Sequence, residues 1–71
     1  MKPSIGRIVH FVVADGLHRP AMIVSAFDGD VVDLHVFKDP GRDVTVSNFQ
    51  RSVRLDPKFS WGSWHWPERE E

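Results

Sequence analysis

Apolar residues in this chain alternate with polar ones at a period of two rather than at the 3.6 that a helix requires. The alternation is clear in "VVDLHVF", where Val32, Leu34 and Val36 fall on one face of an extended segment. Three stretches rich in β-branched and aromatic residues are predicted strands: "RIVHFVVA" (7–14), "AMIVSAF" (21–27) and "VVDLHVF" (31–37). The pattern therefore predicts an all-β protein.

Turn-forming residues separate these strands. The segment "GLHRP" (16–20) is predicted as a turn that ends in Pro20, just before the second strand. "DGD" (28–30) predicts a tight hairpin, and "KDPGRD" (38–43) is the strongest turn signal in the chain. Of two weaker strand candidates, "VTVSNF" (44–49) and "RSVRLD" (51–56), the second is favoured. Five short strands at a spacing of about ten residues predict a small SH3-like barrel or a rolled antiparallel sheet.

The length of 71 residues suits one domain. We predict a single domain over residues 1–67 and a disordered acidic tail, "EREE", over 68–71. A domain this short buries a thin core, and without cysteine it has no disulfide to add stability. Self-association adds buried area in another way, so we expect a homo-oligomer.

Charge and hydropathy exclude several classes of protein. The formal net charge is −1, and the three glutamates and one arginine of the tail supply −2, which leaves the body near neutral. Nucleic acid is therefore not an expected partner, because proteins that bind it usually carry a strong basic excess. No apolar run approaches the roughly 18 residues of a membrane span. We expect a soluble chain without membrane contact, and the lack of cysteine fits a reducing cytoplasm.

Three stretches carry a resemblance to known sequences: "GRIVHFVVADGLHRPAMIV" (6–24), "DLHVF" (33–37) and "WHWPE" (64–68). In these stretches the chain resembles a group of small, uncharacterised proteins encoded by bacteriophages and prophages. The resemblance implies a compact SH3-like β fold and a place of action in the cytoplasm of a bacterial host. It implies no catalytic residue.

All three tryptophans of the chain lie in "WGSWHW" (61–66). One interpretation is that they complete the core, which is favoured for Trp61 and Trp64 and left open for Trp66. The other is that an exposed indole stacks on a nucleobase or anchors a protein interface. Three tryptophans exceed what so small a core needs, so one is expected to face a ligand or a second subunit.

A second group of candidate residues is basic. His18 and Arg19 lie in the predicted turn, where Arg19 can bind a phosphate in a bidentate manner and His18 can orient it. Arg51 is a second candidate for a phosphate. The predicted ligand-binding residues are therefore His18, Arg19, Arg51, Trp64 and Trp66, with Trp64 or Trp66 stacking on a base.

Metal and enzyme chemistry find no support in the sequence. The four histidines show neither HxH nor HxxxH spacing. His10 and His35 can meet across adjacent strands, but a histidine on a strand is usually only a residue of the polar face. No metal and no cofactor is predicted. The serines include no GxSxG motif, and the aspartates of "DGDVVD" (28–33) do not fit a calcium loop, so we predict a protein that is not an enzyme.

Together these features predict a non-enzymatic, phage-type binding module. Its predicted ligand is a small anionic, nucleotide-type molecule, such as a host signal that a phage would sequester to counter bacterial defence. Two alternatives remain: an adaptor that binds a host or phage protein through the same tryptophans, and a small component of the virion or of its assembly.

Overall fold

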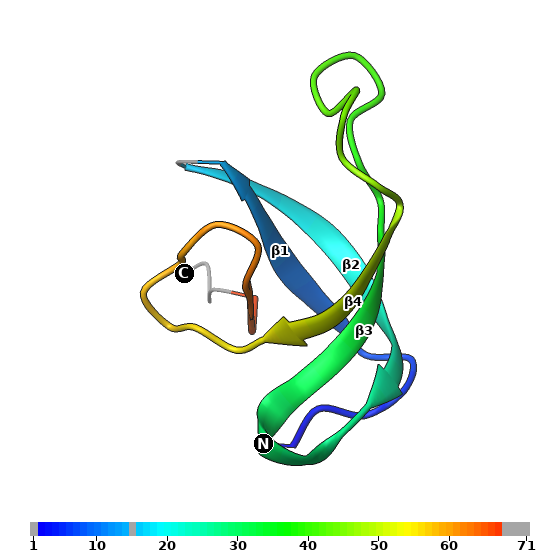
Figure 1. Cartoon of the computed structure of the whole chain (residues 1–71), viewed down its shortest axis with the longest axis vertical. Coiled ribbons are helices and arrows are strands. Elements are labelled where there is room, and N and C mark those ends of the chain that lie inside the picture. Colours follow the sequence, from blue (N-terminus) through cyan, green and yellow to red (C-terminus); the bar gives the residue numbers. More distant parts are fainter. Residues whose placement is uncertain (1, 15, 68–71) are drawn as a thin grey trace.

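The computed structural model describes residues 2–14 and 16–67. Its five strands form a single antiparallel sheet (Figure 1). The strands follow the order β4-β3-β2-β1-β5 across the sheet. Their bounds are β1 (Ile8–Ala14), β2 (Leu17–Ala26), β3 (Val31–Val36), β4 (Phe49–Arg54) and β5 (Trp64–His65). A three-residue 3₁₀ turn, η1 (Asp28–Asp30), connects β2 to β3. The predicted all-β class is confirmed; the predicted tail, 68–71, lies outside the described residues.

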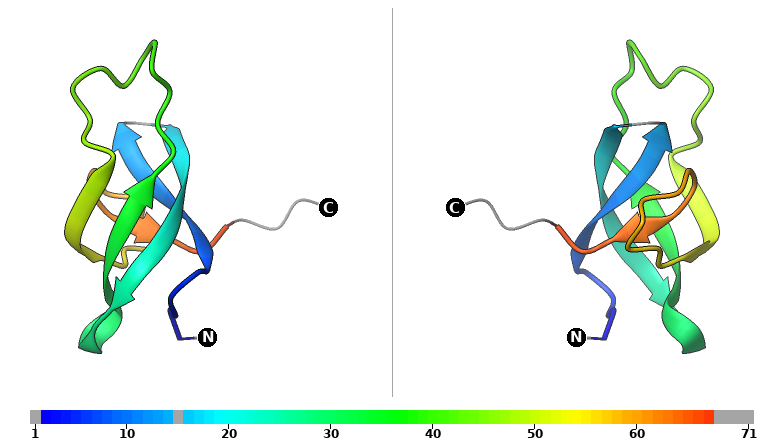
Figure 2. Two further views of the ribbon diagram at one scale, coloured as in Figure 1. Left: turned by 90° about the vertical axis from the view of Figure 1, so that its right-hand side faces the viewer. Right: turned by 90° about the vertical axis from the view of Figure 1, so that its left-hand side faces the viewer.

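The sheet curls into a half-barrel, and the C-terminal segment lies across its open side (Figures 1 and 2). Strand β5 pairs with β1 through His10↔His65 and Phe11↔Trp64. A parallel bridge from Trp64 to Leu55, just after β4, links β5 to the other end of the sheet. The arrangement is consistent with the small SH3-like barrel or rolled sheet that the sequence predicts. No helix in the described part of the chain is long and apolar enough to cross a membrane.

The core fills the inner face of the curled sheet. Residues directly opposite each other on neighbouring strands point to the same side, and the register aligns Phe11 with Trp64 and Ile23 with Leu34. The buried cluster comprises Val9, Phe11, Ala21, Ile23, Val32, Leu34, Val36, Val53 and Trp64. The alternation then places His10, between two core residues of β1, on the outer face.

The turn predicted over residues 16–20 is wrong, because β2 begins at Leu17 and pairs with β1 through Val12↔His18 and Phe11↔Arg19. Pro20 is tolerated inside this strand for a local reason. Strand β3 ends at Val36, opposite Ala21, and the Pro20 carbonyl accepts the Phe37 N–H at 2.9 Å. The missing N–H of Pro20 therefore faces Phe37, one residue beyond the end of β3, where only the last reciprocal bond of the ladder is lost.

The other turn and tryptophan predictions have mixed outcomes. Residues 28–30 form a tight connection, and residues 38–43 form a turn, as predicted. The favoured later strand is confirmed as β4, whereas residues 44–48 belong to a loop. Trp64 is buried as predicted, with 0% of its surface exposed, but Trp61 is 66% exposed and lies outside the core. Trp66 is half-buried against the core cluster.

Candidate functional site

Three histidines from three strands meet on the outer face of the sheet. His10 on β1 is directly opposite His65 on β5, and Val12, two residues along β1, is opposite His18 on β2. Because residues two apart on a strand share a face, all three imidazoles lie on the side opposite the core. We call His10, His18 and His65 the histidine triad.

The triad is compact. The ring centroids are 4.7 Å apart for His18 and His65, 5.3 Å for His10 and His65, and 6.1 Å for His10 and His18. The three pairs of rings are inclined at 69°, 81° and 68°, so no two rings stack in parallel. Each residue offers one ring nitrogen, and these three atoms lie within 4.8 Å of one another.

Hydrogen bonds fix the tautomer of His65. Its Nδ1 lies 2.8 Å from the backbone oxygen of Trp66, and a carbonyl oxygen only accepts, so Nδ1 carries the proton. In the neutral ring, Nε2 then has a free lone pair, which accepts the Nδ1–H of His18 at 2.9 Å. His65 is buried, whereas His10 and His18 are half-buried.

Phe59 covers the triad from the loop that precedes β5. Its ring centroid lies 4.3 Å from that of His65 and 5.2 Å from that of His18. The backbone of Phe59 has φ of 62°, a left-handed conformation that is rare for a bulky residue. Local strain of this kind is often found at functional sites, and here it holds an apolar ring against two imidazoles.

The triad is the group among the described residues whose donors suit a metal ion, and the sequence analysis missed it. His10 and His35, the pair considered from the sequence, lie on β1 and β3 and are separated by β2. The triad instead depends on the pairing of β5 with β1, between residues 55 positions apart, which no local spacing reveals. The one local feature that points to the triad is the "WHW" segment. Because Trp64 is buried in the core, the alternation of a strand places the adjacent His65 on the outer face.

The predicted ligand-binding residues are not gathered at one surface. Trp64 is sealed in the core, where its Nε1–H donates to the Asp30 carbonyl at 2.9 Å. His18 belongs to the triad, and Arg51 is exposed on β4. Trp66 packs edge-to-face on Trp64, with the Arg7 guanidinium 5.5 Å from its ring centroid.

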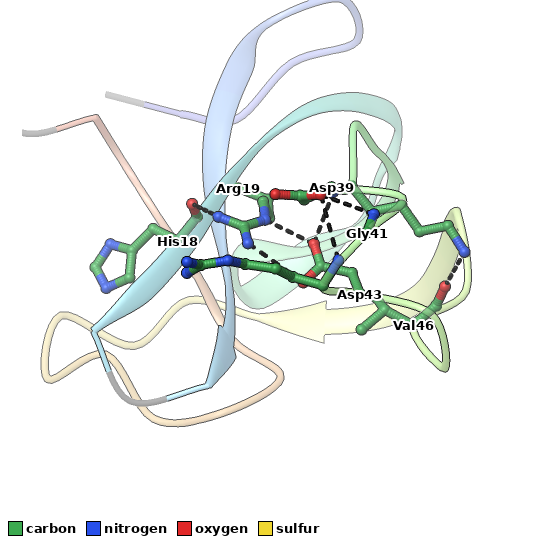
Figure 3. Close-up of polar contacts among 8 residues, drawn as sticks. His18, Arg19, Asp39, Gly41, Asp43 and Val46 are labelled. Atoms are coloured by element: carbon green, nitrogen blue, oxygen red, sulfur yellow. Dashed lines mark hydrogen bonds and ion pairs between the residues drawn. The ribbon is translucent and has the colours of Figure 1, made fainter.

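Arg19, the fifth predicted residue, is bound to a carboxylate (Figure 3). Its Nε donates to Asp43 Oδ2 at 2.6 Å and its Nη2 donates to Oδ1 at 3.3 Å. The Asp39 N–H also donates to Asp43, at 2.8 Å. The Arg19 hydrogen bond and this amide hold the pKa of Asp43 below its usual value. Arg19 thus fastens the loop between β3 and β4 to the sheet.

A second surface of the outer face is apolar and aromatic. The register places Ile8, Met22, His35 and Phe49 in one line across four strands, through Ile8↔Met22, Met22↔His35 and His35↔Phe49. Phe37 stacks on His35, with ring centroids 5.2 Å apart, and Phe49 lies 5.0 Å from the same ring. We call these five residues the aromatic row; Phe49 is 60% exposed and Phe37 is 48% exposed.

A small depression lies elsewhere, between the N-terminal segment and η1. It has a volume of about 150 Å³ and is lined by Lys2, Pro3, Phe27, Asp28, Gly29 and Asp30. Pockets for drug-sized ligands usually measure about 300–1,000 Å³. The size and the two aspartates make this depression a poor match for an anionic nucleotide.

Comparison with known protein families, with curated proteins and with solved structures finds no match for this chain. The two outer surfaces that bear on its function are the histidine triad and the aromatic row. They are neighbours, because Ile8 of the row and His10 of the triad are two residues apart on the same face of β1.

Proposed function

We propose that this protein is a non-enzymatic binding module that recognises another protein through the aromatic row. The observation that carries the proposal is the alignment of Ile8, Met22, His35 and Phe49 in register across four strands. Phe49 in this line and Phe37 beside it are both about half exposed. Isolated apolar residues on a surface are ordinary, whereas a contiguous group of them marks an interaction site.

The chemistry of the aromatic row suits a protein partner. It contains two phenylalanines, a methionine and an isoleucine, and none of its residues is Lys, Arg, Asp or Glu. Aromatic residues and methionine are enriched at the centres of protein interfaces, where charged residues are depleted. Four of its five residues also lie on paired strands, so their backbone is already ordered and docking costs less conformational entropy than it would on a flexible loop.

The same observations favour a protein over a nucleotide-type ligand. Trp64 offers no face to solvent, and the guanidinium of Arg19 is held by Asp43. A nucleotide would need both an accessible aromatic face and a free cation near it. The row itself contains no cation, and of the two predicted phosphate ligands only Arg51, two residues from Phe49 on β4, lies beside it. The row is therefore mainly apolar, which fits an apolar protein surface.

The partner is either a second copy of the chain, as the expected homo-oligomer requires, or a different protein. The resemblance to phage proteins would place a different partner in the cytoplasm of a bacterial host or in the phage itself. Both forms of the proposal use the same row, so one pair of variants tests both.

The test compares Phe49→Ser with Phe27→Ser, a matched control in which a phenylalanine that is 53% exposed outside the row is changed. Sedimentation velocity of the untagged protein measures self-association, and immobilised protein is used to capture partners from a bacterial host and its phage. We expect an assembly that Phe49→Ser weakens by about tenfold or more and Phe27→Ser leaves intact. A monomer that captures nothing, or an assembly equally strong in Phe49→Ser, would overturn the proposal.

A further inference from the structure

We propose that the histidine triad binds one divalent transition-metal ion of the Zn²⁺ type, with His10, His18 and His65 as ligands and a fourth coordination position open. This inference is separate from the protein-binding function, because it rests on different side chains. It also reverses the sequence-based expectation of no metal, which considered spacing along the chain rather than pairing between strands.

The spacing of the rings is close to what a tetrahedral ion requires. With Zn–N bonds of 2.0–2.1 Å, tetrahedral ligand nitrogens lie about 3.3 Å apart and the ring centroids about 5 Å apart. The centroids of the triad are 4.7, 5.3 and 6.1 Å apart, and its candidate nitrogens lie within 4.8 Å of one another. Closing the remaining distance needs small side-chain rotations, mainly of His10, the ring farthest from its neighbours.

The inclination of the rings points the same way. Imidazoles that share one ion radiate from it, whereas imidazoles that merely fill an apolar surface are free to stack. Here the interplanar angles are all between 68° and 81°. The three rings do not stack on one another, and this arrangement is compatible with three imidazoles around one ion.

His65 is arranged as metal-binding histidines usually are. Its Nδ1–H donates to the Trp66 carbonyl, which leaves the Nε2 lone pair directed toward Nδ1 of His18. A backbone carbonyl or carboxylate on the far nitrogen commonly fixes the tautomer of a histidine ligand and orients its ring. His18 becomes a ligand through Nδ1 once its proton moves to Nε2, which replaces the hydrogen bond to His65 with a shared ion.

The donor set selects the class of metal. Three neutral imidazoles suit Zn²⁺, Cu²⁺, Ni²⁺ and Co²⁺, whereas Mg²⁺ and Ca²⁺ prefer carboxylate and carbonyl oxygens. Three protein ligands leave a tetrahedral ion one position for water or for a group from a partner. Phe59 packs against the rings of His18 and His65 and so covers that side of the triad.

A hydrogen-bonded histidine pair is the simpler interpretation, and it explains less. The bond between His18 and His65 needs only those two rings. It does not account for a third imidazole, His10, whose ring centroid lies 5.3 Å from His65 and whose strand places it in register with that residue.

The primary experiment uses the untagged wild-type protein with Co²⁺ and Zn²⁺ alone. Titration with Co²⁺ is expected to produce the visible absorption of a tetrahedral or five-coordinate ion at one equivalent, and Zn²⁺ is expected to displace it. In the NMR spectrum, Zn²⁺ should shift the ring resonances of His10, His18 and His65 and leave those of His35 unchanged. Absence of binding at millimolar metal, or shifts at His35 without shifts in the triad, would overturn the proposal.

Variants locate the site. His10→Gln and His18→Gln each remove a half-buried ligand, and we expect each to weaken Zn²⁺ binding by tenfold or more. His35→Gln is the matched control, because it removes the one other histidine of the chain and should leave the affinity unchanged. Circular dichroism confirms that each variant is folded. Unchanged affinity in both triad variants, or a loss confined to His35→Gln, would contradict the assignment even if the protein binds metal.

Discussion

Besides Asp30 in η1, two non-glycine residues of the described chain hold left-handed backbone conformations. Phe59 does so at the triad, and Ser52 does so in β4, with φ of 54°. Between the pairs Val32↔Val53 and Leu34↔Gln50, strand β4 has one residue more than β3, which makes a bulge. The Ser52 N–H donates to Asp33 Oδ1 at 2.8 Å, so a side chain of β3 fastens the bulge.

Ser52→Gly is expected to stabilise the protein. A left-handed conformation costs an L-residue about 1–2 kcal/mol, and glycine avoids this cost while keeping the N–H that Asp33 accepts. The greater freedom of glycine in the unfolded chain offsets part of the gain, which leaves about 0.5–1 kcal/mol. Urea unfolding measures the difference. Ser4→Gly, at an exposed serine without positive φ, should give no gain; an equal response of the two variants would contradict the argument.

At the scale of elements, the loop between β3 and β4 contains no strand and is held by an ion pair and by hydrogen bonds. Arg19, opposite Phe11 and thus on the inner side of β2, reaches Asp43, whose side chain is 4% exposed. Asp39 stabilises the turn beneath it by accepting the Gly41 N–H at 2.8 Å, and Lys38 Nζ donates to the Val46 carbonyl at 2.8 Å (Figure 3). The loop therefore depends on Asp43 remaining a carboxylate.

Asp43→Asn should destabilise the fold at pH 7, and the difference from wild type should vanish in acid. Arg19 and the Asp39 N–H hold the pKa of the folded-state carboxyl below its usual value. Its contribution is then fully present above the ordinary aspartate pKa of about 4 and is lost as the pH falls through the lowered folded-state pKa. Urea unfolding of both proteins from pH 7 to pH 2 measures this.

The control for that series is Asp28→Asn, which changes an exposed aspartate of η1. It should alter the free energy of unfolding little at any pH, because an isolated surface substitution rarely exceeds about 0.5 kcal/mol. A gap between wild type and Asp43→Asn that stays constant down to pH 2 would show that the loop does not depend on the charge of Asp43.

The elements that could be predicted from the sequence are those specified by local signals. Alternation predicts β1, most of β2, and β3, and the "DGD" turn between two apolar runs predicts their hairpin. The start of β2 was mispredicted because Pro20 reads locally as a break, whereas its tolerance depends on where β3 ends. The triad could not be predicted from the sequence for a similar reason. Strand β5 has only two residues and is defined by its long-range pairing with β1.

At the scale of the whole molecule, the two faces of the sheet have separate roles. The inner face supplies stability through the buried cluster, while the outer face carries both the aromatic row and the histidine triad. Strand alternation allows one strand to serve both faces, because one residue packs in the core while the next lies on the outer face. Trp64 and His65 are the clearest case: the indole fills the core and the next side chain joins the triad.

Trp64 closes the barrel, so its loss should be the most damaging of the tryptophan changes. Its backbone bridges to Leu55 and pairs with Phe11, and its indole Nε1–H donates to the Asp30 carbonyl, so one buried residue joins both ends of the sheet. Trp64→Ala should cost about 3–5 kcal/mol, a large part of the roughly 5–15 kcal/mol that stabilises a typical domain. Trp61→Ala, at a ring that is 66% exposed, should cost less than about 1 kcal/mol.

Urea unfolding followed by far-UV circular dichroism compares the two variants. Trp64→Phe is expected to fall between them because it keeps an aromatic ring in the core. Equal losses for Trp61→Ala and Trp64→Ala would mean that the C-terminal segment does not hold the sheet closed, and β5 could not then position His65.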